Sequence, residues 1–274
     1  MTRLAVIVST YNRPDALAVV LEGFRHQTDQ DFELIVADDG STPETGDLIA
    51  GFQATTPFPV RHLWQEDRGF RKARIHNRAV ATTPADYLVF TDGDCIPRPT
   101  FVARHRALSE PGWLVGGSRI LFSASLTRQV LSGEVEVGQW AWWRWIGAAL
   151  RSEVNRFSPL LSLDPTASWR KLQPRRWTDV RGANMAFWRS DLLAVNGFEE
   201  SYPGWGLEDT DLVIRVLRTG VRHKTGRYAV PVYHLWHLEE DRSRMGENQR
   251  LLASLQQSTR IRALAGLAES AGAG

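Results

Sequence analysis

Residues Val89 to Pro97, with the sequence V-F-T-D-G-D-C-I-P, decide the fold. The apolar run that leads into this stretch from Tyr87 is typical of a short buried strand. It ends in two carboxylates, Asp92 and Asp94, and Gly93 between them lets the chain turn. At the end of a strand in an open α/β sheet such side chains face the ligand-binding crevice, where carboxylate oxygens suit Mg²⁺ or Mn²⁺. An ordinary Asp-Gly turn is the alternative.

Three alternations of strand and helix precede this stretch. The predicted strands are Leu4–Ser9, Phe32–Ala37 and Val60–Trp64, and the predicted helices begin at Pro14, at Pro43 and at Gly69, the last ending at Val80. This β-α-β-α-β-α-β order predicts an α/β fold with a Rossmann-like, mixed but mostly parallel sheet flanked by helices.

The composition indicates a globular chain without an obvious macromolecular partner. With 274 residues, 43% hydrophobic and 23% charged, the chain suits one large α/β domain or two small ones. A net charge of +2 is too small to argue for nucleic acid, and the single Cys95 rules out an internal disulfide. The apolar run near the N-terminus is too short for a signal peptide, and no apolar run is long enough to span a membrane. We therefore expect a cytoplasmic protein.

Two loops at the predicted sheet edge carry candidate nucleotide ligands. Asp38 and Asp39 after the second strand could bind a base or ribose, or could form only a turn and a helix cap. The basic residues near the third helix could meet phosphates or form a solvated face: Arg68, Arg71, Lys72 and Arg74. No G-x-G-x-x-G follows the first strand and no G-x-x-x-x-G-K-[ST] occurs, which argues against a dinucleotide enzyme and a P-loop ATPase.

The second half is harder to interpret. Trp113–Phe122 is predicted to be one strand, and residues 159–174 a long loop that could close over a ligand. Four tryptophans lie in the segment 139–145, Q-W-A-W-W-R-W, where core packing, a sugar-stacking platform and an interfacial patch that touches lipid all remain open. Glu208, Asp209 and Asp211 open a predicted helix that ends at Gly220, an arrangement that the helix dipole alone would favour.

Four motifs in the first hundred residues carry a family resemblance. S-T-Y-N-R-P-D, V-A-D-D-G-S, G-F-R-K-A-R-I-H-N-R-A and F-T-D-G-D-C, in this order, resemble the family 2 inverting glycosyltransferases with the GT-A fold. The resemblance implies uridine contacts from Thr10, Tyr11, Arg13 and Asp39. Asp92-Gly93-Asp94 matches the D-x-D motif, which holds the metal and the sugar-nucleotide diphosphate. Many relatives have Arg where this chain has His76, so we expect Lys72 to contact the nucleotide instead.

The segment from Tyr202 to Leu212, Y-P-G-W-G-L-E-D-T-D-L, resembles the galactosyltransferase-type motif G-W-G-x-E-D-x-D. This motif is shared by β-1,4-galactosyltransferases and chondroitin-polymerase-like enzymes. The resemblance implies that Asp209 is the catalytic base, that Trp205 lies at the sugar sites and that Glu208 binds an acceptor hydroxyl.

Two histidines complete the candidate site. His234 and His237 lie three residues apart after a strand-like run, a spacing that alone is only suggestive. The same family carries a metal ligand here, so both are candidates to join Asp94. Imidazole with carboxylate fits Mn²⁺ somewhat better than Mg²⁺.

The expected function is metal-dependent inverting transfer of a sugar from a UDP-sugar, such as UDP-Gal, UDP-GalNAc or a related hexose. The acceptor would be a saccharide or glycolipid hydroxyl in polysaccharide or glycolipid synthesis. We expect one domain, with a nucleotide-sugar half (1–98), an acceptor and catalytic half (99–240) and a C-terminal helix and tail (241–274). Nucleic acid is not an expected partner, and peripheral contact with the inner face of a membrane stays open. The alternatives are a non-catalytic carbohydrate-binding protein and a sugar-phosphate nucleotidylyltransferase.

Overall fold

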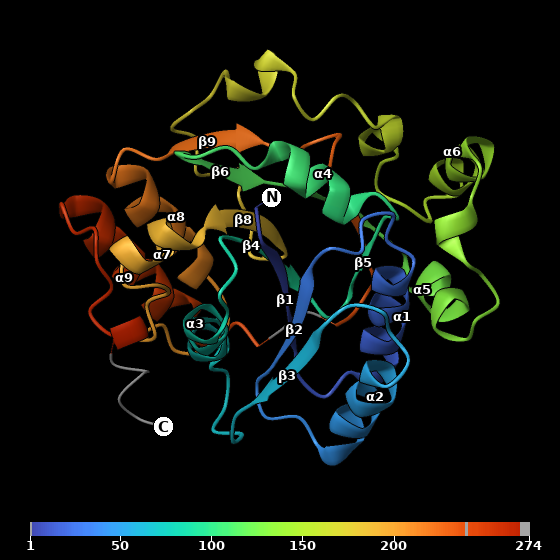
Figure 1. Cartoon of the computed structure of the whole chain (residues 1–274), viewed down its shortest axis with the longest axis horizontal. Coiled ribbons are helices and arrows are strands. Elements are labelled where there is room, and N and C mark those ends of the chain that lie inside the picture. Colours follow the sequence, from blue (N-terminus) through green and yellow to red (C-terminus); the bar gives the residue numbers. More distant parts are fainter. Residues whose placement is uncertain (1, 239–240, 269–274) are drawn as a thin grey trace.

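The computed structural model describes residues 2–238 and 241–268 (Figure 1). This part of the chain forms a seven-stranded sheet of order β3-β2-β1-β4-β8-β6-β9 and a three-stranded sheet of order β5-β10-β7. Helices cover both faces of the larger sheet, with α1 and α2 on one side and α3, α7 and α8 on the other (Figure 1). The predicted mixed, mostly parallel α/β fold is confirmed.

The first half of the chain follows the predicted order closely. Its elements are β1 (Leu4–Thr10), α1 (Pro14–Arg25), β2 (Glu33–Asp38), α2 (Pro43–Gln53), β3 (Val60–Trp64), α3 (Lys72–Thr82) and β4 (Tyr87–Asp92). These four strands are parallel, so their carboxyl ends meet at one edge. The helix α3 begins three residues later than Gly69, because Arg71 has φ −133° and ψ 39°, which is not helical backbone. The Arg71 N–H donates to the Asp39 carboxylate.

The apolar runs of the strands are explained by burial on both faces. In β1, Leu4, Val6 and Val8 pack toward α1 and α2, and the alternate residues Ala5 and Ile7 pack toward α3 and α8. All five are buried. A strand buried on both faces shows no alternation of apolar and polar residues, which is the pattern expected of a parallel sheet between two helical layers.

The remaining elements form the second half of the chain. They are β5 (Cys95–Pro97), α4 (Phe101–Leu108), β6 (Trp113–Gly116), β7 (Ser118–Leu121), α5 (Ala124–Leu131), α6 (Trp142–Leu150), β8 (Asn184–Trp188), α7 (Arg189–Ala194), α8 (Glu208–Arg218), β9 (Arg222–Thr225), β10 (Pro231–His234) and α9 (Met245–Gln257). Strand β8 runs antiparallel to β4, and β10 lies between β5 and β7 in the small sheet.

The prediction of a single strand over Trp113–Phe122 was wrong. The chain leaves the large sheet after β6 and enters the small sheet at β7, and Gly117 is the residue at the crossing. A Cβ atom at this position would lie 2.2 Å from Cγ of Asn184, so only glycine fits. The Asn184 side chain in turn donates to the carbonyls of Ser118 and Val230, which fastens β7 beside β10.

The segment predicted as a long loop, 159–174, contains two short 3₁₀ turns, Ser158–Leu161 and Ser168–Lys171. Arg170 is fully buried there, and its guanidinium donates to the backbone carbonyls of Leu163, Asp164, Thr225 and Arg227. These bonds attach the segment to the end of β9.

The tryptophan-rich segment divides between core and surface. Trp145 is 4% exposed and stacks on Tyr233 with ring centroids 4.8 Å apart, and Trp140 packs edge-on against it. Core packing therefore describes these two. Trp142 and Trp143 are 70% and 61% exposed at the start of α6, so a surface role remains open for them. Within residues 2–238 and 241–268, no helix has the length and apolar character that a membrane span requires.

This division predicts two different outcomes for tryptophan truncation. Trp145→Ala should lower the free energy of unfolding by about 3–5 kcal/mol, because it leaves a cavity against Tyr233. The double variant W142A/W143A should change it by about 0.5 kcal/mol or less, since both side chains are exposed. Urea denaturation followed by circular dichroism measures both, and an equal loss of stability in the two variants would contradict the division.

Candidate active site

The Asp92-Gly93-Asp94 turn lies at the carboxyl edge of the parallel strands. The Gly93 N–H donates to the Ser9 carbonyl at 2.7 Å, and a Cβ atom on Gly93 would lie 2.9 Å from that oxygen and 3.2 Å from the Thr10 side chain. Only glycine therefore allows the turn to pack against the end of β1. The two carboxylates of this turn have different partners.

Asp92 is paired with Lys72, which begins α3. The Lys72 Nζ and Asp92 Oδ1 atoms are 2.5 Å apart, and the Ser9 hydroxyl donates to the same oxygen at 3.0 Å. Burial opposes both charges, but the charge of Lys72 brings the pKa of Asp92 below its ordinary value. The charges of Asp92 and then Glu208 likewise raise the pKa of Lys72. The pair is therefore ionised at neutral pH. Lys72, which was predicted to contact a nucleotide, is bound to Asp92 in this structure.

Asp94 faces the two histidines. Its Oδ2 atom lies 3.6 Å from Nε2 of His234 and 3.3 Å from Nε2 of His237, and the three potential ligand atoms lie within 4.8 Å of one another. The antiparallel pairing of β5 with β10 places His234 opposite Cys95, the residue after Asp94. Burial lowers the pKa of His234, which favours the neutral imidazole that binds metals. One carboxylate and two imidazoles at these distances fit a divalent cation.

The residues expected at the nucleoside lie at the ends of β1 and β2. Thr10 is buried, and its hydroxyl has no hydrogen-bond partner among the described residues. The half-exposed Tyr11 donates to Asp67 at 2.9 Å. Asp39 accepts from Gln65 at 2.5 Å and from the Arg71 N–H at 2.7 Å. These three groups border the same edge of the sheet.

Asp38 and Arg13 have local partners instead. Asp38 is fully buried, accepts from the Ser41 N–H at 2.8 Å and pairs with His62 at 3.0 Å, so it forms the turn at the end of β2. The Arg13 guanidinium pairs with Asp15 at 2.9 Å, at the start of α1.

His76 cannot replace the arginine that many relatives carry at its position. It is 1% exposed, between the rings of Phe90 and Phe198 at centroid distances of 5.1 Å and 4.9 Å. Burial, with the nearby charge of Lys72, lowers the pKa of His76 to about 3. A neutral, enclosed imidazole does not bind phosphate, so the basic residues of the site lie elsewhere.

Glu208 and Asp209 begin α8 after a strained turn. Leu207 has φ 77°, in the left-handed region that disfavours leucine, between Gly206 and the helix. The N–H groups of Gly182 and Thr210 donate to the Asp209 carboxylate at 2.7 Å and 2.6 Å. The side chain of this residue therefore has a fixed orientation.

The neighbouring Glu208 lies in a different environment. It is 7% exposed, and its Oε2 atom has no hydrogen-bond partner among the described residues. Burial, together with the charge of Asp209, raises the pKa of Glu208 to about 7. The carboxyl borders a cavity of about 180 Å³ that Lys72, Tyr202 and Gly204 also line.

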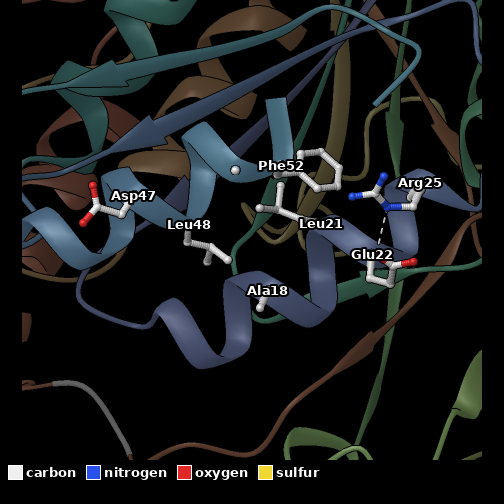
Figure 2. Close-up of a pocket in the computed structure, with 8 residues that line it drawn as sticks. Ala18, Leu21, Glu22, Arg25, Asp47, Leu48 and Phe52 are labelled. Atoms are coloured by element: carbon white, nitrogen blue, oxygen red, sulfur yellow. Dashed lines mark hydrogen bonds and ion pairs between the residues drawn. The ribbon is translucent and has the colours of Figure 1, made fainter. Parts of the chain in front are cut away.

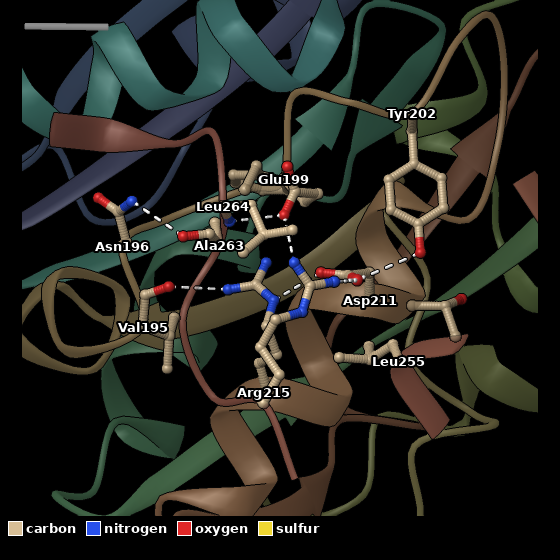
Figure 3. Close-up of polar contacts among 12 residues, drawn as sticks. Val195, Asn196, Glu199, Tyr202, Asp211, Arg215, Leu255, Ala263 and Leu264 are labelled. Carbon is tan, nitrogen blue, oxygen red and sulfur yellow. Dashed lines mark hydrogen bonds and ion pairs between the residues drawn. The ribbon is translucent and has the colours of Figure 1, made fainter. Parts of the chain in front are cut away.

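Asp211, the third acid of the motif, has a structural role. It is fully buried and pairs with Arg215 at 2.5 Å, while the Tyr202 hydroxyl donates to it at 3.2 Å (Figure 3). Arg260, from the segment after α9, bridges Asp211 and Glu199 at 3.4 Å and 2.6 Å. This network fastens the beginning of α8 to the C-terminal segment.

Trp205 is half-buried in the same turn. The Asn248 side chain in α9 donates to the carbonyls of Trp205 and Gly206 at 3.2 Å and 2.8 Å, and the Arg242 guanidinium lies 5.4 Å from the Trp205 ring centroid. Trp205 and Glu208 therefore lie within one turn, and of the two only Glu208 is among the described residues that line the cavity.

A second hollow, of about 380 Å³, lies between α1 and α2 (Figure 2). It contains the surface pair Arg25–Glu22, with 3.0 Å between the charged atoms, and apolar side chains such as Leu48 and Phe52. These helices cover the face of the sheet opposite α3 and α8, and the candidate acids and histidines do not line it. We assign no function to this hollow.

Comparison with known proteins agrees with this architecture. The family model described as glycosyl transferase family 2 matches residues 5–167, and the one described as the N-terminal domain of galactosyltransferase matches residues 167–238. The fold and the acidic edge define a GT-A protein. The chain belongs to glycosyl transferase family 2.

Individual relatives are distant in sequence. Validoxylamine A glucosyltransferase of Streptomyces hygroscopicus subsp. jinggangensis is 28% identical over 89% of this chain and 57% of that protein. Chondroitin synthase of Escherichia coli is 23% identical over 84% of this chain and 34% of that protein. The chain thus spans about half or less of the length of these relatives.

Solved structures share the fold. The mannosyltransferase PcManGT from Pyrobaculum calidifontis, in complex with GDP-Man and Mn²⁺, has a TM-score of 0.60 and 17% identity over 99% of this chain and 73% of that one. A UDP complex of S. aureus TarS also has a TM-score of 0.60, with 15% identity over 98% of this chain and 68% of that one.

The environment of Glu208 predicts a pH-dependent stability. Its pKa of about 7 in the folded chain exceeds the ordinary 4.5, so the folded state binds more protons between these values and loses stability as pH rises through them. Glu208→Gln removes this loss. Relative to wild type, the variant should gain up to about 1.4 kcal/mol per pH unit across that interval.

Urea denaturation at several pH values measures this difference, and the exposed Glu66→Gln serves as the control. A stability difference between wild type and Glu208→Gln that does not change with pH would show that Glu208 is ionised as an ordinary carboxyl.

Proposed function

We propose that this chain is a metal-dependent inverting glycosyltransferase that moves a hexose from a UDP-sugar to a hydroxyl of a saccharide or glycolipid. One observation carries the proposal. Acids from β4 and from α8 meet at one sheet edge, where the charge of Lys72 interacts with Asp92, Glu208 and Asp209. This meeting supports the proposal, because transfer to a hydroxyl requires a donor site and a base close together.

The donor half would use the ends of the first strands. Thr10, Tyr11 and Asp39 border the place for the nucleoside, and the free hydroxyl of Thr10 supports such a contact. Arg13 would have to exchange its pairing with Asp15 for the nucleotide. Lys72 would keep its ion pair with Asp92 and donate a further hydrogen bond to a phosphate, because its ammonium group has three N–H donors.

The metal ligands in this proposal are Asp94, His234 and His237, whose geometry supports a divalent ion. A bound Mn²⁺ or Mg²⁺ would supply Lewis-acid stabilisation of the diphosphate. The solved relative named above was obtained with GDP-Man and Mn²⁺, which supports a metal but leaves the nucleotide to be tested.

Asp209 would take the proton from the acceptor hydroxyl. Its carboxylate is oriented by the Gly182 and Thr210 N–H groups and still has lone pairs that can accept a proton. Glu208, whose Oε2 atom has no partner, would accept a hydrogen bond from the acceptor, with Trp205 beside the sugar. Attack from the face opposite the nucleotide is a single displacement and inverts the anomeric carbon.

The division of the chain is part of the same proposal. Residues 1–98 would bind the nucleotide-sugar and residues 99–240 the acceptor, while the segment after 240 supports α8 through Arg260 and Asn248. The exposed Trp142 and Trp143 would allow peripheral contact with the inner face of a membrane that carries a glycolipid acceptor.

The test is a panel of UDP- and GDP-sugars incubated with the protein, with nucleotide release measured in Mn²⁺, in Mg²⁺ and in EDTA. We expect release from UDP-sugars that requires a divalent ion. Nucleotide release from GDP-sugars alone would contradict the proposed UDP-sugar donor. Equal nucleotide release in EDTA would contradict the proposed metal requirement.

The metal proposal makes a separate prediction. Asp94→Asn should weaken Mn²⁺-dependent binding of UDP by roughly tenfold or more, because a charged ligand to the ion is lost. Calorimetric titration of UDP with and without Mn²⁺ measures the effect. The control is Asp86→Asn, whose half-exposed carboxylate pairs with Arg3. Unchanged Mn²⁺-dependent binding in Asp94→Asn would exclude Asp94 as a ligand.

The two adjacent acids should respond differently to substitution. Asp209→Asn should lower kcat by about 10²–10⁴-fold at nearly unchanged donor affinity, because it keeps the shape but removes the base. Glu208→Gln should mainly raise the KM for the acceptor. Steady-state measurement of kcat and of the acceptor KM in both variants tests these two assignments. A nearly active Asp209→Asn beside an inactive Glu208→Gln would reverse the two assignments.

A further inference from the structure

Arg119 lies on the same face of the small sheet as the histidine ligand candidate His234. In the parallel pair of β7 with β10, Arg119 is opposite Val232 and Leu121 is opposite His234. Side chains two residues apart in a strand share a face, and so do residues directly opposite each other. Arg119 and His234 therefore project from one side of this sheet, the side on which Cys95 of β5 also lies.

The Arg119 guanidinium has no partner in the described part of the chain, although the residue is half-buried. No carboxylate there pairs with it, since Asp92 is bound to Lys72 and Ser9, and Asp94 faces the histidines. Its charge is nevertheless near enough to act on Asp92, Cys95 and His234. An arginine that is half-buried next to acids, and yet unpaired, is available to an anion.

The position of Arg119 is fixed by the crossing between the two sheets. The Gly117 N–H donates to the Asn184 carbonyl at 2.9 Å, and the Asn184 side chain donates to the carbonyl of Ser118, the residue before Arg119. The backbone that carries the guanidinium is thus attached to β8 on one side and to β10 on the other. Such an attachment holds an arginine in place before a ligand arrives.

The order of the elements indicates which part of a nucleotide would reach this residue. Thr10 and Asp39, the proposed nucleoside contacts, lie at the ends of β1 and β2, whereas Arg119 is on the small sheet that begins after Asp94. A nucleoside diphosphate that extends from the first strands across Asp94 would bring its terminal phosphate toward β7.

We propose that Arg119 binds the terminal phosphate of the nucleoside diphosphate and stabilises it as the leaving group. This inference rests on the proposed function. As the acceptor oxygen forms its bond to the anomeric carbon, the bond between that carbon and the phosphate oxygen breaks. The electron pair of the broken bond stays on the phosphate oxygen, and the acceptor's proton goes to Asp209. The terminal phosphate then gains a negative charge, which a planar guanidinium can meet with two parallel hydrogen bonds.

The experiment compares UDP, UMP and uridine by calorimetric titration in Mn²⁺, on wild type, Arg119→Lys and Arg119→Met. The control is Arg128→Met, at an exposed arginine in α5. A lost hydrogen bond to a charged group should cost Arg119→Met roughly 10–100-fold in UDP affinity. UMP and uridine, which lack the terminal phosphate, should change by less than about threefold. Arg119→Lys should recover part of the UDP affinity, and Arg128→Met should match wild type.

Each outcome decides the matter. Equal loss of UDP and UMP affinity in Arg119→Met, or no loss of either, would overturn the role of Arg119 while leaving the proposed donor intact. A wild-type protein that binds UDP no better than uridine would overturn both the role and the UDP-sugar donor. Melting temperature, and Mn²⁺ titration without nucleotide, should be nearly the same in wild type and Arg119→Met, which separates a lost ligand contact from a folding defect.

Discussion

The ion pair between Lys72 and Asp92 is the interaction on which the site depends. Four acids, Asp92, Asp94, Glu208 and Asp209, are brought to one edge of the sheet from segments far apart in the sequence. Such acids repel one another, and repulsion is stronger where water is excluded. Lys72, at the first residue of α3, supplies a positive charge among them, and the Asp39–Arg71 hydrogen bond fixes where that helix starts. The end of β2 and the acids at the sheet edge are therefore coupled through one helix terminus.

Glu208 and Asp209 show how adjacent residues of the same chemical type acquire different properties. Asp209 receives two backbone N–H groups, so its charge is compensated locally. Glu208 is turned into the cavity, where burial and the neighbouring charge raise its pKa to about 7. A carboxyl whose pKa is raised beside a second acid is typical of sites where the acids have different roles. The left-handed Leu207 and the buried network around Asp211 and Arg260 hold the turn that creates this difference.

Much of this architecture could be predicted from the sequence, because the strands of the first half are continuous apolar runs and the loops after them carry the polar residues. The D-G-D turn, the E-D pair and the two histidines are also local patterns. The split between β6 and β7 was not predictable, since it depends on Asn184, a residue distant in sequence that packs on Gly117. Nor could local pattern reveal that Lys72 pairs with Asp92, or that Trp145 is core while Trp142 is exposed. The sequence did not indicate a role for Arg119, because a single basic residue in a strand says nothing of a binding site until the residues around it in space are known.

The order of strands in the small sheet has a consequence for biosynthesis. β10 is the last strand of the described chain, yet it lies between β5 and β7, which are not hydrogen-bonded to each other. During synthesis β5 and β7 leave the ribosome first. Their edges that pair with β10 stay without a partner strand until residues 231–234 have also been released. The nascent chain can complete the four parallel strands β1 to β4 well before His234 reaches Asp94. A growing polypeptide would therefore hold these strands in place while His234 and His237 are still absent.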